Sequence, residues 1–277
     1  MIHPTAIIGK EVKLGSNVKV GPYVFIDGNV SIGDNTEIFA SSSITGNTII
    51  GENNKIFSFC SIGSIPQDLK YLGEESFVKI GNSNTFREFC TVNSGTQGGG
   101  CDTVIGSGSL FMTAVHIAHD CVVGNNVIMA NQATLGGHVI VEDNAVIGGL
   151  SAIHQFCRIG ELSMIGGMSA VENDVFPFAL AIGNRAKITG LNLIGLKRAN
   201  YKKSDIHSVN NFIRDIFSSN KSIQTEISNI KDNANILINK ISDFISIKSS
   251  RGLCRYCLLY TSPSPRDLST SRMPSSA

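Results

Sequence analysis

The chain has 277 residues, enough for a large domain and a smaller one, and 23 lysines and arginines nearly balance 22 aspartates and glutamates. The resulting charge of +1 gives no indication of a nucleic-acid partner or of binding to an anionic membrane surface. No apolar run is long enough to span a membrane, and Met1 leads almost directly into a repeat, so we expect neither stable membrane insertion nor a signal peptide. The seven cysteines are scattered and odd in number, which predicts reduced thiols and a cytoplasmic location.

An aliphatic or similar residue recurs at every sixth position, and glycine often follows it. A period of six does not match a helical stripe, but it suits a short strand followed by a corner in which Gly, Asn or Asp takes up the turn. Three hexads make one triangular coil of about eighteen residues, and stacked coils bury a continuous column of aliphatic side chains. The series comprises Ile8, Leu14, Val20, Ile26, Ile32, Ile38, Ile44, Ile50, Ile56 and Ile62, then Ile80, Phe86 and Val92, then Ile105 and every sixth residue to Val171.

The repeat therefore predicts a mainly β fold, a parallel β-helix built from hexapeptide repeats over residues 1–185. Prisms of this type wind left-handed, against the usual rule for parallel crossovers. The alternatives are a right-handed solenoid and an ordinary sandwich, and more than twenty hexads in phase disfavour both.

Two inserts interrupt the repeat, at residues 64–76 and 94–103. The first is polar, and because loops on a rigid scaffold often carry function, Asp68 and Lys70 are candidates there. The second contains three consecutive glycines, which indicate either a flexible flap or a close approach of backbone. It lacks the Lys and Ser/Thr of a P-loop, so phosphate cradling is rejected.

Beyond the repeat, apolar residues at three- and four-residue spacing predict an α-helical domain over residues 186–250, with helices at 193–199, 205–217 and 223–247. Ser204 before Asp205 is the expected helix N-cap. Residues 251–277 are rich in Ser, Pro and Arg and have no period, which predicts a disordered and possibly non-native tail. The lone C-x-x-C at Cys254 and Cys257 therefore carries little weight as a metal or redox site.

Three histidines stand out inside the repeat. His138 follows His119 by nineteen residues, and His154 follows His138 by sixteen. The sum is close to two coils, so all three are expected near one edge of the prism, on coils spaced roughly 5 Å apart. His116, half a hexad before His119, is expected to flank it.

Several roles are open to this cluster. His119 could act as a general base toward an alcohol, with Asp120 orienting it and the backbone N–H of Gly137, eighteen residues later, pointing at a developing oxyanion. The histidines could instead bind Zn²⁺, although their H-x-x-H spacing differs from that of zinc enzymes with this fold. Finally, they could be satisfied surface or subunit-interface histidines in a purely structural protein.

The segments IPQDLKYLGE, TQGGG, VHIAHDCVVGNN, IHQFCRIG and LNLIGLKRAN, in this order, resemble the UDP-N-acetylglucosamine O-acyltransferase family, the first enzymes of lipid A biosynthesis in Gram-negative bacteria. The resemblance runs from His3 to about Leu253. It implies a homotrimer with active sites between subunits, and transfer of a 3-hydroxyacyl chain from acyl carrier protein to the sugar 3-hydroxyl. No metal and no cofactor is implied, since the acyl-phosphopantetheine arrives on the carrier protein.

The resemblance also implies roles for individual residues. His119 would be the base, Asp120 its partner and Gly137 the oxyanion donor. Gly167 would form the floor of the acyl groove, where bulk limits chain length. Substrate contacts would come from Gln67, Asp68, Lys70, His116, His138 and His154, and contacts to a nucleotide or phosphopantetheine phosphate from Asn192 and Arg198.

Three departures from the usual family pattern are Asn93-Ser94 before Gly95-Thr96, Arg185, and Ile194 in place of an acidic residue. They concern sugar–nucleotide contacts and acyl length and leave the proposed base untouched. Two enzymatic alternatives remain beside the structural one. One is an N-acyltransferase of the same fold and pathway, disfavoured because no extra domain precedes the hexads. The other is a zinc enzyme resembling carbonic anhydrase.

Overall fold

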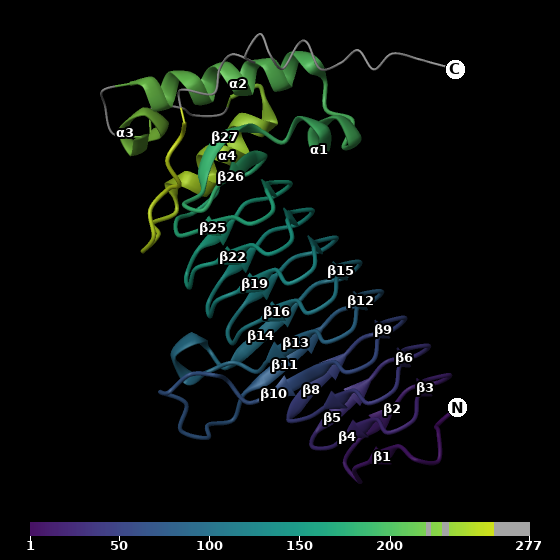
Figure 1. Cartoon of the computed structure of the whole chain (residues 1–277). Helices are drawn as coiled ribbons and strands as arrows, with labels where there is room; N and C mark the ends of the chain where they lie inside the picture. The colour runs from purple at the N-terminus through teal and green to yellow at the C-terminus, as the bar shows by residue number, and fades with distance from the viewer. Residues whose placement is uncertain (220–222, 229–232, 258–277) are drawn as a thin grey trace, which may run out of the picture.

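A computed structural model describes residues 1–219, 223–228 and 233–257. The chain winds as a triangular prism whose coils stack from the N-terminus toward a group of helices at the other end (Figure 1). Successive strands go to three different parallel sheets, so each sheet collects every third strand. Consecutive strands of one sheet are in register one coil apart, as in the pairing of Ile8 with Ile26 and of Ile26 with Ile44.

The three sheets contain most of the described chain. The first sheet consists of β1 (Ile7–Ile8), β4 (Phe25–Ile26), β7 (Ser43–Ile44), β10 (Ser61–Ser64), β13 (Thr91–Asn93), β16 (His116–Ile117), β19 (Thr134–Leu135), β22 (Ala152–Ile153) and β25 (Ala170–Val171). The second consists of β2 (Lys13–Leu14), β5 (Val30–Ile32), β8 (Asn47–Ile50), β11 (Phe77–Ile80), β14 (Asp102–Ile105), β17 (Val122–Val123), β20 (Ile140–Val141) and β23 (Arg158–Ile159). The third consists of β3 (Lys19–Val20), β6 (Glu37–Ile38), β9 (Lys55–Ile56), β12 (Thr85–Phe86), β15 (Leu110–Phe111), β18 (Ile128–Met129), β21 (Val146–Ile147), β24 (Met164–Ile165), β26 (Ala179–Ile182) and β27 (Lys187–Leu191).

The sixth-position aliphatic residues form the core of the prism. Ile26, Ile44 and Ile62 lie one above another in the first sheet and are completely buried. Burying one such side chain contributes about 1.5–3 kcal/mol, so the column as a whole stabilises the stack although no single coil could. The glycine after the core residue is required by the close spacing of the coils. A Cβ on Gly51 would lie 2.0 Å from Asn82 Oδ1 and 2.8 Å from the Gly81 carbonyl oxygen.

The three edges of the prism differ in composition. The edge between the first and second sheets, here the histidine edge, includes turns 118–121, 136–139 and 154–157. The edge between the second and third sheets, here the asparagine edge, includes turns 15–18, 51–54 and 124–127, whose third residue is asparagine with positive φ. The third edge includes turns 57–60, 87–90 and 148–151, whose third residue is an exposed Phe or Leu.

Both inserts leave the prism at the histidine edge, because one joins β10 to β11 and the other joins β13 to β14. The first forms the loop that projects from the prism beside these strands (Figure 1). The second is shorter than expected, since Asp102 and Thr103 already pair in β14. After each insert the register resumes, with Ile80 paired to Ile50 and to Ile105.

Within the described residues the prism ends in a hairpin and four α-helices. β27 follows the expected boundary at residue 185 and pairs antiparallel with β26. The helices are α1 (Leu193–Arg198), α2 (Lys203–Ser218), α3 (Ile223–Ser228) and α4 (Ile236–Ser246). They lie across the end of the prism (Figure 1). The guanidinium of Arg158 lies 4.3 Å from the centroid of the Phe244 ring and ties α4 to the last coils.

The expected N-cap at Ser204 is wrong, because α2 begins at Lys203 and Lys202 is its N-cap residue. Ser204 lies inside the first turn, where its hydroxyl donates to Asp205 instead of accepting from the backbone. The buried face of α2 carries the residues that the three- and four-residue spacing indicated: Ile206, Val209, Ile213 and Ile216.

The expectation of disorder is wrong for residues 251–257, while residues 258–277 lie outside the described residues. Leu253 bridges to Asp174 and Tyr256 bridges to Ile188, so this segment extends the end of the prism. Cys254 is buried and donates to the Ala186 carbonyl, and burial raises the pKa of its thiol to about 11. Backbone pairing and apolar burial therefore outweigh the polar composition here. None of the described helices has the length and apolar character needed to cross a membrane.

Candidate active site

The histidine edge brings the chemically capable side chains together because its turns stack coil upon coil. His119, Gly137 and Gln155 occupy the second position of successive turns, and Asp120, His138 and Phe156 occupy the third. The third residue has positive φ in each turn, for example 61° at His138. The same conformation occurs at the third edge, so it belongs to the coil and does not by itself mark a site.

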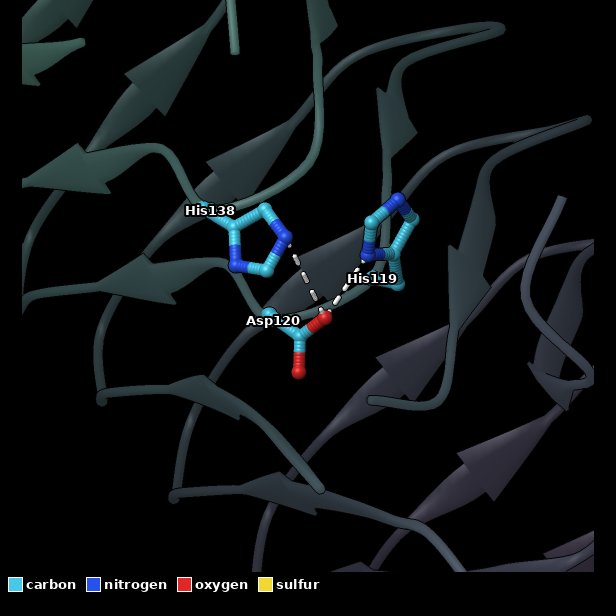
Figure 2. Close-up of side chains that lie close together, drawn as sticks. All are labelled: His119, Asp120 and His138. Carbon is cyan, nitrogen blue, oxygen red and sulfur yellow. Dashed lines mark hydrogen bonds and ion pairs between the residues drawn. The ribbon is translucent and has the colours of Figure 1, made fainter. Parts of the chain in front are cut away.

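His119 and Asp120 form a buried, directly bonded pair (Figure 2). The Nδ1 atom of His119 lies 2.7 Å from Oδ2 of Asp120, and the side chains are 7 and 0% exposed. Because a carboxylate accepts hydrogen bonds, Nδ1 carries the proton and Nε2 is left with a free lone pair. Nε2 points toward the first insert, 4.0 Å from Oδ2 of Asp68. An imidazole oriented in this way is suited to general-base chemistry.

Asp120 is held from three further directions. Its Oδ1 accepts from the backbone N–H of Thr96 at 2.8 Å, and its Oδ2 accepts from the Thr96 hydroxyl at 2.6 Å. Its own N–H donates to the Thr103 hydroxyl at 2.8 Å. With both carboxylate oxygens and the backbone N–H of Asp120 engaged, the carboxylate that orients His119 has little freedom to move.

His138 lies on the other side of Asp120 (Figure 2). Its ring is edge-on to His119, with centroids 5.1 Å apart, and stacks on Phe156 with centroids 4.4 Å apart. Its Nε2 lies 3.8 Å from Asp120 Oδ2. Burial lowers the pKa of His138, partly offset by the charge of Asp120, so the ring is neutral at pH 7 and can both donate and accept.

Gly137 lies directly against the ring of His119. A Cβ at this position would be 2.4 Å from Cε1 and 2.5 Å from Nε2 of His119, so only glycine allows the imidazole to occupy this place. Among the residues that the structure describes, none accepts a hydrogen bond from the Gly137 N–H. An unpaired donor beside the base is the arrangement that an oxyanion requires.

A cavity of about 410 Å³ opens beside this group, between the two inserts and the histidine edge. Glu74 of the first insert accepts from the backbone N–H of Gln97 in the second, at 3.0 Å, and so joins the two loops. The pKa of Glu74 is held below its usual range by this and other backbone hydrogen bonds. The lining residues are Asp68, Lys70, Leu72, Glu74, Thr96, Gln97, Gly98, His138 and Phe156.

The other expected residues of this edge lie further from the pair. His116 is half-buried on β16, and its Nδ1 bonds the Thr91 hydroxyl at 2.7 Å; burial lowers its pKa. His154 is exposed and its Nδ1 lies 3.3 Å from the Gln155 carbonyl. Gln67 is exposed on the first insert. Within one chain the structure therefore brings together His119, Asp120, Gly137, His138 and Asp68. His154 and Gln67 are exposed, and no hydrogen bond or ion pair joins either of them to the His119–Asp120 pair.

Gly167, Asn192 and Arg198 are not brought to the histidine edge of the same chain. Gly167 is exposed at the third edge, two coils along from Asn131. Asn192 caps α1, because its Oδ1 accepts from the Gly195 N–H and its Nδ2 donates to the Leu162 carbonyl at the asparagine edge. Arg198 is exposed at the end of α1.

His119, Asp120 and His138 also form the arrangement that a metal ion could use. One ligand atom from each lies within 4.8 Å of the others, and three protein ligands are the number that a catalytic zinc takes. In the observed arrangement the Nδ1–H of His119 is already donated to Asp120, so a metal would have to use Nε2 or displace that proton.

The site residues that were absent from the sequence-based candidates include Thr96, Glu74 and Phe156. Phe156 follows His138 by eighteen residues, so the coil arithmetic that aligned the histidines could have found it. Thr96 and Glu74 lie in the inserts, where the period is interrupted and no spacing indicates a partner.

A prism of hexads with loops and an oriented base at one edge is the arrangement of a hexapeptide-repeat transferase. Residues 102–137 match the family described as bacterial transferase hexapeptide (six repeats), and residues 174–254 match domain 2 of UDP-N-acetylglucosamine O-acyltransferase. An acyl-[acyl-carrier-protein]--UDP-N-acetylglucosamine O-acyltransferase of Aliarcobacter butzleri is 47% identical over 253 residues, covering 91% of this chain and 97% of its own. Its counterpart in Sulfurovum sp. is 51% identical over 223 residues, 80% and 85% of the two chains. The chain belongs to the UDP-N-acetylglucosamine O-acyltransferase family.

Solved structures agree with this assignment. The UDP-N-acetylglucosamine acyltransferase from Campylobacter jejuni superposes with a TM-score of 0.86 at 39% identity, covering 93% of this chain and all of the other. The Francisella novicida protein gives a TM-score of 0.88 at 29% identity over 99% of this chain and all of its own. The predicted fold class, a left-handed parallel β-helix with C-terminal helices, is thereby confirmed.

Proposed function

We propose that the protein catalyses the first step of lipid A biosynthesis, in the cytoplasm, by transferring a 3-hydroxyacyl chain from acyl carrier protein to the 3-hydroxyl of UDP-N-acetylglucosamine. The relatives' names support the reaction class. The observation that carries the proposal is the His119–Asp120 pair, with Nε2 free beside the Gly137 N–H and a cavity.

In the proposed mechanism Nε2 of His119 removes the proton of the sugar hydroxyl as its oxygen attacks the thioester carbonyl. The carbonyl oxygen gains the negative charge and accepts from the Gly137 N–H. The intermediate then collapses, the C–S bond breaks, and the imidazolium returns its proton to the phosphopantetheine sulfur. Asp120 stabilises the imidazolium without taking its proton. Each proton is returned, so the reaction needs no oxidant, cofactor or metal.

Substrate contacts are proposed for the residues around the pair. Asp68 and Lys70 line the cavity, and His138 offers a neutral ring there. The remaining contacts are proposed on the family resemblance. They are Gln67, His116 and His154 for substrate, Asn192 and Arg198 for a phosphate or nucleotide, and Gly167 for the end of the acyl groove.

A homotrimer with active sites between subunits is part of the proposal. Gly167 lies at another edge of the prism than His119, and Arg198 lies at the end of α1, so a site that uses all of them draws on more than one chain. The third edge also exposes a row of apolar residues, and Phe59 stacks on Phe89 with centroids 5.2 Å apart while both remain about half exposed. Such a row suits burial between prisms. A molecular mass in solution of a single chain, measured by sedimentation equilibrium, would contradict this part.

The helical domain is proposed to receive the carrier protein through Lys197, Arg198, Lys202 and Lys203, opposite an acidic partner. A cavity of about 670 Å³ between α1, α2 and the β26–β27 hairpin includes Lys197 and Lys203, with His207 and Arg214 from α2. Added salt should raise the Michaelis constant for the acyl carrier protein, because exposed charges are screened. An unchanged constant would contradict docking by charge.

The test of the function is transfer from 3-hydroxyacyl carrier proteins of several chain lengths to UDP-N-acetylglucosamine, with and without chelator, for wild type and His119→Ala. We expect transfer that resists the chelator and falls at least about 100-fold in the variant. Near-full activity of His119→Ala would contradict the mechanism. Loss of transfer on chelation, with one zinc per chain, would favour the metal alternative. Preference for an amino-sugar acceptor would favour the N-acyltransferase.

A further inference from the structure

The second insert makes a contact with the site that the proposed mechanism has not used. Thr96 is buried, 6% exposed, and donates twice to the same carboxylate: its N–H to Oδ1 and its hydroxyl to Oδ2 of Asp120. The hydroxyl bond, at 2.6 Å, has the length of a charge-assisted O–H···O⁻ hydrogen bond. Oδ2 is also the atom that accepts from His119.

The side chain of Thr96 is diverted from its ordinary local role. Thr96 is the N-cap residue of the short 3₁₀ helix η1 (Gln97–Gly99) and has an extended backbone, with φ −123° and ψ 158°. A threonine at an N-cap usually accepts a hydrogen bond from a backbone N–H of the first turn through its side-chain oxygen. Here no such bond forms, and the hydroxyl is used on Asp120.

The loop that carries Thr96 is pressed against Asp120. A Cβ on Gly99 would lie 2.1 Å from Asp120 Cγ, so the glycine run allows a contact that no other residue would permit. On its outer side the loop is held by Glu74, which accepts from the Gln97 N–H. Of the three glycines, Gly99 is the one that makes the close backbone approach.

We propose that Thr96 is a positioning residue that holds Asp120, and through it His119, in the geometry needed for proton abstraction; this rests on the proposed function. Two donors stabilise the ionised form of a buried carboxylate, which then accepts the Nδ1–H of His119 and leaves Nε2 for the substrate. The Thr96 hydroxyl also offsets part of the negative charge on Oδ2 of Asp120. His119 therefore does not hold the proton taken from the substrate too strongly. Thr96 itself needs no contact with substrate.

The chain offers matched controls. Thr103 is also buried and bonded to Asp120, but its hydroxyl accepts from the backbone N–H of Asp120 and is not bonded to the carboxylate. Thr36 is buried far from the site and bonds the Gly51 carbonyl. Comparing Thr96→Val, Thr103→Val and Thr36→Val separates the loss of the carboxylate's donor from the loss of a buried hydroxyl in general.

The experiment measures the pH dependence of kcat and the Michaelis constant for UDP-N-acetylglucosamine on the full chain. Thr96→Val should lower kcat about 10- to 100-fold, the usual effect of losing a partner that orients a reactive group, with little change in the Michaelis constant. The acid limb of its pH profile, where kcat falls as the pH is lowered, should move to higher pH. The reason is that the Asp120 carboxylate, having lost a donor, attracts the imidazolium proton of His119 more strongly. Thr96→Ser should restore both properties, and Thr36→Val and Thr103→Val should leave the acid limb unmoved.

A wild-type kcat and acid limb in Thr96→Val would overturn the proposal, as would an equal shift in Thr103→Val. If Thr96→Val does not fold, Thr96→Ala removes the hydroxyl without introducing a new methyl group and takes its place. Full activity of His119→Ala would instead remove the proposed function, whatever the Thr96 variants do.

Discussion

The histidine edge and the asparagine edge are built from the same turn and put it to opposite uses. At the asparagine edge the second residue of the turn donates its N–H to a side chain of a neighbouring coil, as Ser107 does to Asn125 Oδ1 at 2.9 Å and Asn125 does to Asp143 Oδ1 at 2.7 Å. At the histidine edge none of the described residues accepts a hydrogen bond from the equivalent N–H of Gly137. The backbone N–H groups of the asparagine edge form hydrogen bonds between coils that stabilise the fold. At the histidine edge the N–H of Gly137 stays available to a ligand.

This difference explains why the site lies at the histidine edge. A free N–H is a by-product of the turn, and at the asparagine edge a polar side chain of a neighbouring coil takes it up. Around Gly137 the available positions carry His119 and Gln155, whose side chains form no such bond, and two inserts close over the place. The proposed role of the Gly137 N–H requires that this repeat interaction be left unmade, in accord with the occurrence of strained or unsatisfied groups at active sites.

The largest effect is expected for Gly137→Ala. The added Cβ would occupy the place of the His119 ring, and the ring is bonded to Asp120 and has no easy alternative. We expect kcat to fall about 100- to 1000-fold, the size of losing an oxyanion donor or displacing a base, while the fold is retained. Steady-state kinetics and circular dichroism check this. Activity within a few-fold of wild type would mean that the ring tolerates displacement.

A smaller effect, on stability and not on activity, is expected for Asn125→Ala at the asparagine edge. The variant loses the acceptor for the Ser107 N–H, a cost of about 0.5–1.5 kcal/mol in the free energy of unfolding. Activity per folded molecule should not change. Denaturant unfolding and steady-state kinetics on the same sample test this. A loss of activity without a loss of stability would contradict the assignment of a purely stabilising role to the asparagine edge.

The smallest effect concerns pH, since the asparagine edge has no histidine and the histidine edge has several. Burial lowers the pKa of His116 and His138 below the ordinary value of 6.5. The unfolded chain therefore takes up protons first as the pH falls through 6.5, and stability that is complete above this value is lost below it, until the folded pKa values are reached. Tm should fall between about pH 7 and pH 5, and His116→Gln should make the decline shallower. If Tm of His116→Gln falls with pH as steeply as that of wild type, the pH dependence of stability arises from other groups.

The prism could be predicted from the sequence because each hexad repeats the same physical requirement. A core residue at every sixth position, with glycine or asparagine where coils crowd or φ is positive, leaves few other folds. The ends were harder to predict. Polar composition suggested disorder at residues 251–257, yet Leu253 and Tyr256 pair with the last coils, because exposed strand edges there offer backbone partners that composition does not record.

The site could be predicted only where the period holds. Gly137 follows His119 by one whole coil and His138 follows Asp120 by one, so spacing alone brought them to one edge. Thr96 reaches Asp120 from a loop of irregular length, and no periodicity links the two. Gly167 and Arg198 are separated from His119 within one chain, and their proposed roles come from family resemblance, since the pattern in a single chain carries no information on a neighbouring one.

The nearest-neighbour register of the prism has a consequence for how the protein is made. Ile26 pairs with Ile8, eighteen residues earlier, and even across the first insert Ile80 pairs with Ile50, thirty residues earlier. Each coil therefore finds its template already present when it leaves the ribosome, and the pair of His119 and Asp120 can assemble before the helices are synthesised. Residues 251–257 follow the helices in the chain and then pair with Asp174 and Ile188 at the end of the prism.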